Sequence, residues 1–209
     1  NSLGSNYNFK YVLNSLFSDT DNANQKFKRL LENKYDGKAI LTYKGREALT
    51  LALKILDLPK ESLVAINGFT CFAVYKAVEQ AGLSPICLDL EDENTDLNFS
   101  AEILQKSLKN NPKIKVVIVQ NTLGYPCDIE EILEVCKKNN LIIIEDLAHC
   151  VGTKYLNGKE AGSIGDFVAL SFSQDKVIDA VSGGALVIKN IKYKLASQGE
   201  TLEAKQQLR

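Results

Sequence analysis

The chain has 209 residues, of which 45% are hydrophobic and 24% are charged, and its formal net charge is −1. This length suffices for one well-packed core. The balanced charge gives no electrostatic reason to expect nucleic acid or an anionic membrane as partner, and no apolar run approaches the roughly 20 residues that span a bilayer.

The cysteines and the single histidine bound the chemistry further. The five cysteines are odd in number, include no pair at CxxC spacing and lie mostly in apolar stretches, so we expect reduced thiols in a cytoplasmic protein. One histidine and scattered cysteines argue against a zinc site, and we expect no metal. The polar N-terminus lacks the apolar core of a secretory signal. The absence of methionine, even an initiator, suggests a fragment or a processed chain.

Apolar runs alternate with amphipathic stretches, which predicts one α/β domain over 1–209 with a mostly parallel central sheet flanked by helices. Its N-terminal region, 1–35, is predicted to be helical. The expected helices are 24–33, 46–56, 71–81, 101–108 and one that Asp128 opens, and the expected strands are 63–66, 86–90, 114–120, 141–145, 167–172 and 185–188. The last two strands are close in sequence, so we expect at least one antiparallel pair.

The first candidate loop precedes the helix at 46–56. Gly45 stands directly before this helix, and Arg46 and Glu47 form its first turn. A helix start presents free backbone N–H groups and the positive end of the helix dipole, which together suit a phosphate. A plain turn-to-helix junction would have the same short pattern.

A second loop, at 68–72, follows the strand at 63–66 and contains Phe69, Cys71 and Phe72. Ligands of such sheets bind at the carboxyl ends of the strands, and an aromatic side chain there can stack on a flat ring. The pattern would fit equally well if Phe69 and Phe72 were core residues.

A third loop begins where the strand at 141–145 ends. Asp146 follows an apolar run, where burial of an unpaired carboxylate would be costly, so we expect a cationic partner. A helix cap or an ordinary ion pair would also explain this residue. His149 lies three residues further on and could donate a hydrogen bond to a ring oxygen of a ligand, or could be a packed or solvated side chain.

The fourth loop joins Ser171, at a strand end, to Lys176 and then to a glycine pair at 183–184. A lysine in this position can project into the same cleft as the serine hydroxyl, and its neutral amine can attack a carbonyl. Lys176 and Asp146 together match what pyridoxal phosphate (PLP) needs: an amine that holds it as a Schiff base, and an acid that keeps its ring nitrogen protonated. Most lysines are solvated surface groups, so the agreement of the four loops carries this hypothesis.

These segments resemble, in order and spacing, the nucleotide-sugar aminotransferases of the DegT type, a family of fold type I PLP enzymes. The resemblance covers nearly the whole chain. It is carried by residues 45–49, 68–70, 121–128, 145–149 and 162–184, of which the last stretch is the most specific.

The resemblance implies a role for each matching residue. Lys176 would form the Schiff base, and Asp146 would pair with the ring nitrogen. His149 would contact the hydroxyl side of the ring. Ser171 would hold the phosphate together with the turn at Gly45 and the backbone N–H groups of Arg46 and Glu47. Cys71 stands where the family often has a ring-stacking aromatic, so we expect Phe72 or Phe69 to compensate.

The resemblance also implies an activity. It is the transfer of an amino group from an amino acid, glutamate or glutamine, to a keto group of a nucleotide-linked sugar, in a homodimer whose site lies at the subunit interface. Family members have roughly 350–400 residues, a size that splits into two domains, so the small C-terminal domain is expected to be absent. One alternative is a PLP-dependent sugar dehydratase of the same family. Some of those carry histidine in place of the lysine, so Lys176 favours transfer. A second alternative is a non-catalytic or truncated PLP-binding relic.

Overall fold

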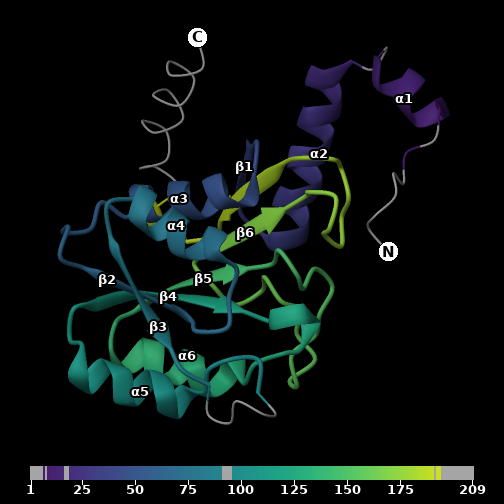
Figure 1. Ribbon diagram of the computed structural model, residues 1–209. Coiled ribbons are helices and arrows are strands. Elements are labelled where there is room, and N and C mark those ends of the chain that lie inside the picture. Colours follow the sequence, from purple (N-terminus) through teal and green to yellow (C-terminus); the bar gives the residue numbers. More distant parts are fainter. Residues whose placement is uncertain (1–6, 8, 17–18, 91–95, 191, 194–209) are drawn as a thin grey trace.

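The structure, a computed structural model, describes residues 7, 9–16, 19–90, 96–190 and 192–193. Seven strands form one sheet in the order β1-β7-β6-β5-β4-β2-β3 (Figure 1). The strands are β1 (Lys38–Thr42), β2 (Leu63–Asn67), β3 (Ser84–Leu88), β4 (Ile114–Gln120), β5 (Ile142–Asp146), β6 (Phe167–Ser171) and β7 (Gly184–Ile188). The helices are α1 (Phe9–Leu16), α2 (Thr20–Tyr35), α3 (Gly45–Ile55), α4 (Phe72–Gln80), α5 (Ala101–Asn110) and α6 (Ile129–Lys138), with a short 3₁₀ turn, η1 (Thr122–Gly124).

The predicted α/β architecture is confirmed. The neighbouring strands β3, β2, β4, β5 and β6 pair in parallel, and β7 pairs antiparallel with both β6 and β1. The short separation of the last two strands in the sequence predicts the antiparallel pair of β6 and β7. The described part of the region 1–35 forms α1 and α2. Asp128 begins α6 as expected, because its side chain accepts a hydrogen bond from the Glu131 N–H at 3.4 Å. No helix among the described residues combines the length and the apolar character needed to cross a bilayer.

The structure corrects the predictions at both edges of the sheet. The sequence pattern does not predict β1, because only Ala39 of its five residues is buried. At the opposite edge, β3 begins at Ser84 instead of Ile86, so Pro85 lies inside it, which an edge strand tolerates because one side of its backbone has no neighbour. Cys71, expected to begin a helix, is instead the residue that precedes α4.

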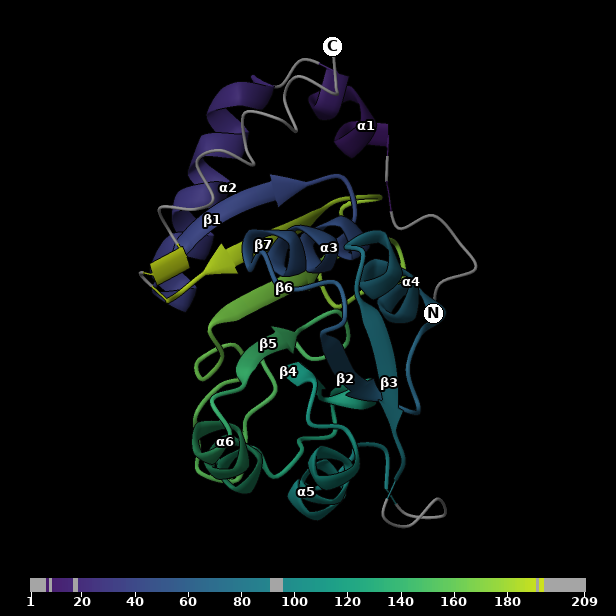
Figure 2. The same ribbon diagram turned by 90° about the vertical axis from the view of Figure 1, so that its left-hand side faces the viewer.

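The central strands are buried on both faces, and the two helical layers cover opposite faces (Figure 2). In β4, Val116 and Ile118 pack in one apolar cluster with α3 and α4, whereas Val117 and Val119 pack in the other with α2, α5 and α6. Side chains alternate between faces along a strand, so this continuous β-branched run supplies both clusters. The alternation along each strand therefore determines toward which face of the sheet its last side chain points.

Glu145 holds the long connection between β5 and β6. Its side chain is fully buried and accepts four hydrogen bonds, from the Tyr155 hydroxyl at 2.7 Å and from the backbone N–H groups of Gly162, Ile164 and Gly165 at 2.7, 2.9 and 2.5 Å. A buried carboxylate is tolerated only where donors surround it. This carboxylate thus anchors the segment that leads into β6, the strand that ends at Ser171.

We predict that Glu145→Gln destabilises the domain. The amide nitrogen would face N–H donors, which leaves buried groups unpaired and costs on the order of 2–3 kcal/mol, or roughly 5–10 °C in Tm for a domain of this size. Thermal unfolding followed by circular dichroism measures the difference. Glu134→Gln, on the exposed face of α6, is the matched control and should unfold with the wild type. A Glu145→Gln protein with an unchanged Tm would contradict the anchoring role.

Candidate active site

Three polar side chains come together at the carboxyl-terminal ends of neighbouring strands, because these strands are parallel. Two of the three residues were predicted as site residues. Gln120, Asp146 and Ser171 are the last residues of β4, β5 and β6, and all three are buried. Two positions before each of them stands Ile118, Ile144 or Ala169, and these three side chains belong to the apolar cluster that packs against α3 and α4. Because side chains alternate along a strand, Gln120, Asp146 and Ser171 point toward that same face of the sheet. The N-terminus of α3 lies against this group.

The Asp146 carboxylate is buried at the end of β5, with 5% of the residue's surface exposed. Its Oδ1 accepts a hydrogen bond from the Ala148 N–H at 3.0 Å, and its Oδ2 accepts one from Gln120 Nε2 at 3.3 Å. Burial raises its pKa above the ordinary value of an aspartic acid, and the two hydrogen bonds and the nearby His149 and Lys176 oppose that rise only in part. A cation in direct contact is what this carboxylate lacks among the described residues, and a protonated ring nitrogen would supply it.

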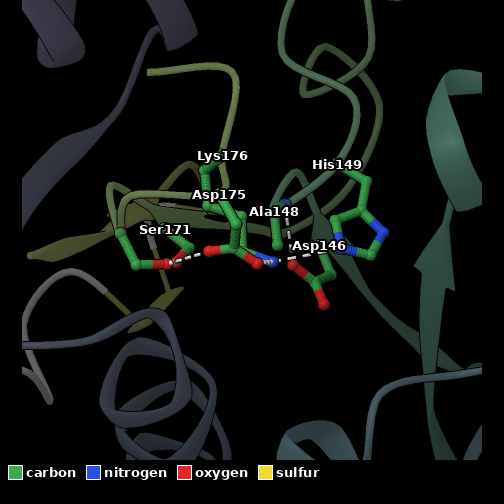
Figure 3. Close-up of polar contacts among 7 residues, drawn as sticks. Asp146, Ala148, His149, Ser171, Asp175 and Lys176 are labelled. Carbon is green, nitrogen blue, oxygen red and sulfur yellow. Dashed lines mark hydrogen bonds and ion pairs between the residues drawn. The ribbon is translucent and has the colours of Figure 1, made fainter. Parts of the chain in front are cut away.

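Lys176 and His149 meet beside Asp146 (Figure 3). The Nζ atom of Lys176 lies 3.1 Å from His149 Nε2 and 3.0 Å from Asp175 Oδ2, and 14% of the lysine side chain is exposed. The carboxylate of Asp175 accepts a further hydrogen bond from the Ser173 hydroxyl at 2.9 Å. The hydrogen bond from Lys176 is the main cause that lowers the pKa of Asp175. The structure thus brings together the predicted amine, acid and histidine, which come from two different loops.

The start of α3 forms a cradle that suits a phosphate. Its preceding residue, Lys44, provides no side-chain cap, and among the described residues no acceptor lies within hydrogen-bond reach of the Arg46 N–H. The Glu47 N–H already donates to the Lys44 carbonyl at 3.1 Å. A Cβ atom at Gly45 would lie 2.7 Å from Ser171 Cβ, so only glycine lets the helix start approach this serine. The uncapped N–H group, the positive end of the helix dipole and the Ser171 hydroxyl therefore lie together at the start of α3, where a phosphate could bind.

Gly184, the second glycine of the pair at 183–184, allows a similar close approach between β7 and the loop before α3. A Cβ atom at Gly184 would lie 2.5 Å from the carbonyl carbon of Lys44, so the first residue of β7 must lack a side chain for the α3 loop to pack on it. Among the described residues, the hydroxyl of Ser171 has one hydrogen-bond partner, Ser173 Oγ at 3.5 Å. It therefore keeps hydrogen-bonding capacity for a ligand held at the helix start.

The aromatic side chains of the 68–72 loop are not core residues. Phe69 is 51% exposed and Phe72 is 66% exposed, and Phe72 stacks on Tyr75 with ring centroids 5.8 Å apart. Cys71 is also exposed. The loop is tied to the site through Thr70, whose hydroxyl donates a hydrogen bond to Gln120 Oε1.

Sequence reasoning missed Gln120, Thr70 and Asp175. Gln120 ends a strand that reads as an apolar run, and the one available signal was an amide at the carboxyl end of a buried strand. Asp175 stands next to the predicted lysine, where its charge alone indicated an ion pair. Across the described residues, no group of three or more histidine, cysteine, aspartate or glutamate side chains has an arrangement that could hold a metal ion.

The seven-stranded, mostly parallel sheet is the fold of the PLP-dependent aminotransferases of fold type I. The chain belongs to the DegT/DnrJ/EryC1/StrS aminotransferase family, whose model matches residues 5–203. An aminotransferase from Psychrobacter cryohalolentis, known from its X-ray structure, is 32% identical and superposes with a TM-score of 0.73, over 81% of this chain and 42% of that one. Helicobacter pylori PseC, at 20% identity, shares the fold with a TM-score of 0.74 over 83% of this chain and 46% of its own.

Curated relatives point the same way. The GDP-perosamine synthase of Escherichia coli O157:H7 is 33% identical over 171 residues, which are 81% of this chain and 46% of that protein. The dTDP-3-amino-3,6-dideoxy-alpha-D-galactopyranose transaminase of Aneurinibacillus thermoaerophilus is 31% identical over 175 residues, which are 84% of this chain and 46% of that protein. The matched segments cover less than half the length of these relatives.

We predict that Asp146→Asn stabilises the cofactor-free protein at neutral pH. The folded-state pKa of Asp146 is raised, so its contribution to stability is present at low pH and is lost as the pH rises through that raised value. Asparagine has no charge to bury. Each kcal/mol recovered should raise Tm by roughly 2–4 °C.

Melting curves of cofactor-free wild type and Asp146→Asn between mildly acidic and neutral pH test this sign. The difference in Tm should shrink as the pH falls toward the ordinary pKa of an aspartic acid, about 3.9. A variant that is less stable than the wild type at neutral pH would mean that the buried carboxylate is already compensated in the cofactor-free protein.

Proposed function

We propose that this chain is the PLP-binding part of an aminotransferase that transfers an amino group from an amino acid to a keto group of a nucleotide-linked sugar. The observation that carries the proposal is the convergence of Asp146, His149 and Lys176 beside an uncapped helix start. The activities for which the relatives are named, a GDP-perosamine synthase and a dTDP-amino-sugar transaminase, support the substrate class. Glutamate or glutamine as the donor rests on the family resemblance.

The residues present fit PLP at each of its functional groups. Gly45, Ser171 and the Arg46 N–H would hold the phosphate, and Asp146 would face the ring nitrogen. We place His149 on the hydroxyl side of the ring. Phe72 and Cys71 would border the ring from the 68–72 loop, where the exposed Phe72 side chain has room to move over it. When bound, PLP supplies a protonated aromatic ring that accepts electrons from the substrate carbon.

The protein's own groups would then act on protons and charge. Asp146 keeps the ring nitrogen protonated, and its burial strengthens that interaction because little water screens it. Lys176 would hold the cofactor covalently at rest, and its Nζ atom, when free, would move a proton at the substrate carbon. His149, 3.1 Å from Nζ, orients the lysine.

We predict that Lys176→Ala abolishes covalent attachment of PLP and leaves the fold intact. The amine of Lys176 contacts the polar side chains of His149 and Asp175 and not the apolar core, so its removal should lower the unfolding free energy by about 1 kcal/mol or less. Borohydride reduction in the presence of PLP, followed by peptide mass spectrometry, locates the attachment. Lys137→Ala, an exposed position on α6, is the control and should be labelled like the wild type. Cofactor on another lysine, or on the Lys176→Ala protein, would refute the assignment.

We further propose a cytoplasmic homodimer whose sites lie at the subunit interface. Large apolar side chains are exposed around the site, namely Phe69, Phe72, Leu123, Tyr125 and Val177, each with at least 51% of its surface accessible. A second subunit would remove this apolar rim from water, and two-fold dimers are the commonest closed assemblies. The five cysteines are free, which supports a reducing compartment.

Sedimentation velocity over a wide range of concentrations tests the assembly, and we expect a dimer. Leu123→Ser combined with Tyr125→Ser should weaken it, because both side chains lie on the rim and neither lies in the cofactor cradle. The matched control is Leu156→Ser, which removes an apolar side chain that is 87% exposed and lies outside the rim. A wild type that remains monomeric at high concentration would contradict the dimer.

A further inference from the structure

Thr70, Gln120 and Asp146 form a continuous chain of hydrogen bonds from the 68–72 loop to the acid of the site. The Thr70 hydroxyl donates to Gln120 Oε1, and Gln120 Nε2 donates to Asp146 Oδ2 at 3.3 Å. Gln120 and Asp146 are partners in the β4–β5 register, so the sheet itself sets them side by side. Gln120 is 7% exposed and Asp146 is 5% exposed, whereas Thr70 is half-buried.

The direction of these hydrogen bonds follows from the chemistry of the groups. An ionised carboxylate only accepts, so Gln120 must present its NH₂ group to Asp146. The amide oxygen then points away and needs a donor, because a buried polar group without a partner is costly. The Thr70 hydroxyl is that donor. It thereby fixes the amide in the orientation that stabilises a charged Asp146.

Other groups near Asp146 do not replace the hydrogen bond from the Gln120 side chain to its carboxylate. The Ala148 N–H binds the second carboxylate oxygen, His149 and Lys176 lie nearby, and the effects of all of them on the pKa of Asp146 are opposed by burial. The Cys150 thiol, whose Sγ lies 3.5 Å from the Asp146 carbonyl, stays neutral because burial raises its pKa to about 12. Among the described residues, Gln120 is the one side chain that donates a hydrogen bond to the Asp146 carboxylate.

We propose that Gln120 and Thr70 are positioning residues, in which Thr70 locks the amide of Gln120 so that it holds Asp146 ionised and directed at the ring nitrogen of the cofactor. The inference rests on the proposed function. It also gives the 68–72 loop a second role. Because Thr70 belongs to the loop whose aromatic side chains border the ring, a displacement of this loop would release the amide and weaken the hold on the acid.

The test measures the binding of pyridoxamine phosphate, which carries the same ring nitrogen and phosphate but cannot link covalently to Lys176. Its dissociation constant would be determined by calorimetry for the wild type, Gln120→Leu, Thr70→Val and Thr70→Ser. Thr153→Val is the matched control, because its hydroxyl donates to the Gly124 carbonyl and, within the described part of the chain, has no hydrogen bond to a proposed site residue. We expect Gln120→Leu to bind about tenfold more weakly, as loss of a hydrogen bond to a charged group implies.

The pH dependence separates positioning from mere structural damage. Without the amide donor the pKa of Asp146 rises further, so a smaller fraction is ionised as the pH falls. The ratio of variant to wild-type dissociation constants should therefore grow from mildly alkaline to mildly acidic buffer. Thr70→Val should show the same trend, because an unlocked amide can turn its oxygen toward the carboxylate. Thr70→Ser keeps the hydroxyl and should restore binding, and the pair decides the question if Gln120→Leu does not fold.

Two results would count against the proposal in different ways. A wild type that binds no pyridoxamine phosphate would overturn the proposed function and this inference with it. A wild type that binds, with Thr70→Val equal to Thr70→Ser or with a ratio that does not change with pH, would overturn the positioning role alone.

Discussion

The burial of the Asp146 carboxylate is the constraint on which the site depends. A charge at the end of a central strand, covered by helices on both faces, is unfavourable unless a partner compensates it. The protein supplies one backbone N–H and one amide NH₂ group, which is less than a carboxylate can accept. The remaining compensation would come from a ligand that carries a positive charge at this point, so the same burial that costs stability would favour cofactor binding.

A second buried carboxylate, one residue earlier, solves the same problem in the opposite way. Glu145 points to the other face of the sheet and accepts four hydrogen bonds from its own chain. Tyr155, which donates one of them, also accepts a hydrogen bond from Asn121 Nδ2 at 3.2 Å. Adjacent acids on one strand therefore differ in role because alternation places them in different surroundings. One is saturated by the protein and holds a loop, and the other is left with capacity for a ligand.

The phosphate cradle depends on close backbone approach instead of charge. Gly45 and Gly184 both lack side chains where β6, β7 and the start of α3 come together. Ser171 can lie against the helix start only because Gly45 and Gly184 have no Cβ atom, which would collide with the neighbouring backbone or side chain. The distance between the cradle and Asp146 is then set by β5 and β6, which are neighbouring strands of one sheet and would keep the proposed phosphate and ring contacts at a fixed separation.

The sequence by itself determined the fold class, the main strands and the candidate residues of the site. Continuous β-branched runs predict strands buried on both faces, and a carboxylate after such a run stands out because burial of charge is costly. Lys176, Asp146, His149 and Ser171 were predicted as site residues from such signals, and the family resemblance implies their roles. These signals are local, since each depends on a residue type at the end of a run.

Only the tertiary structure decided which residues meet across strands. The contact between Gln120 and Asp146 comes from register, and Thr70 reaches Gln120 from a connection fifty positions earlier in the chain. The edge strand β1 and the proline within β3 were also hidden, because strands with a half-exposed surface lack the apolar pattern that marks central ones. Long-range pairing leaves no periodic trace in the sequence, so the hydrogen-bond chain behind the acid became visible only when the strands were side by side.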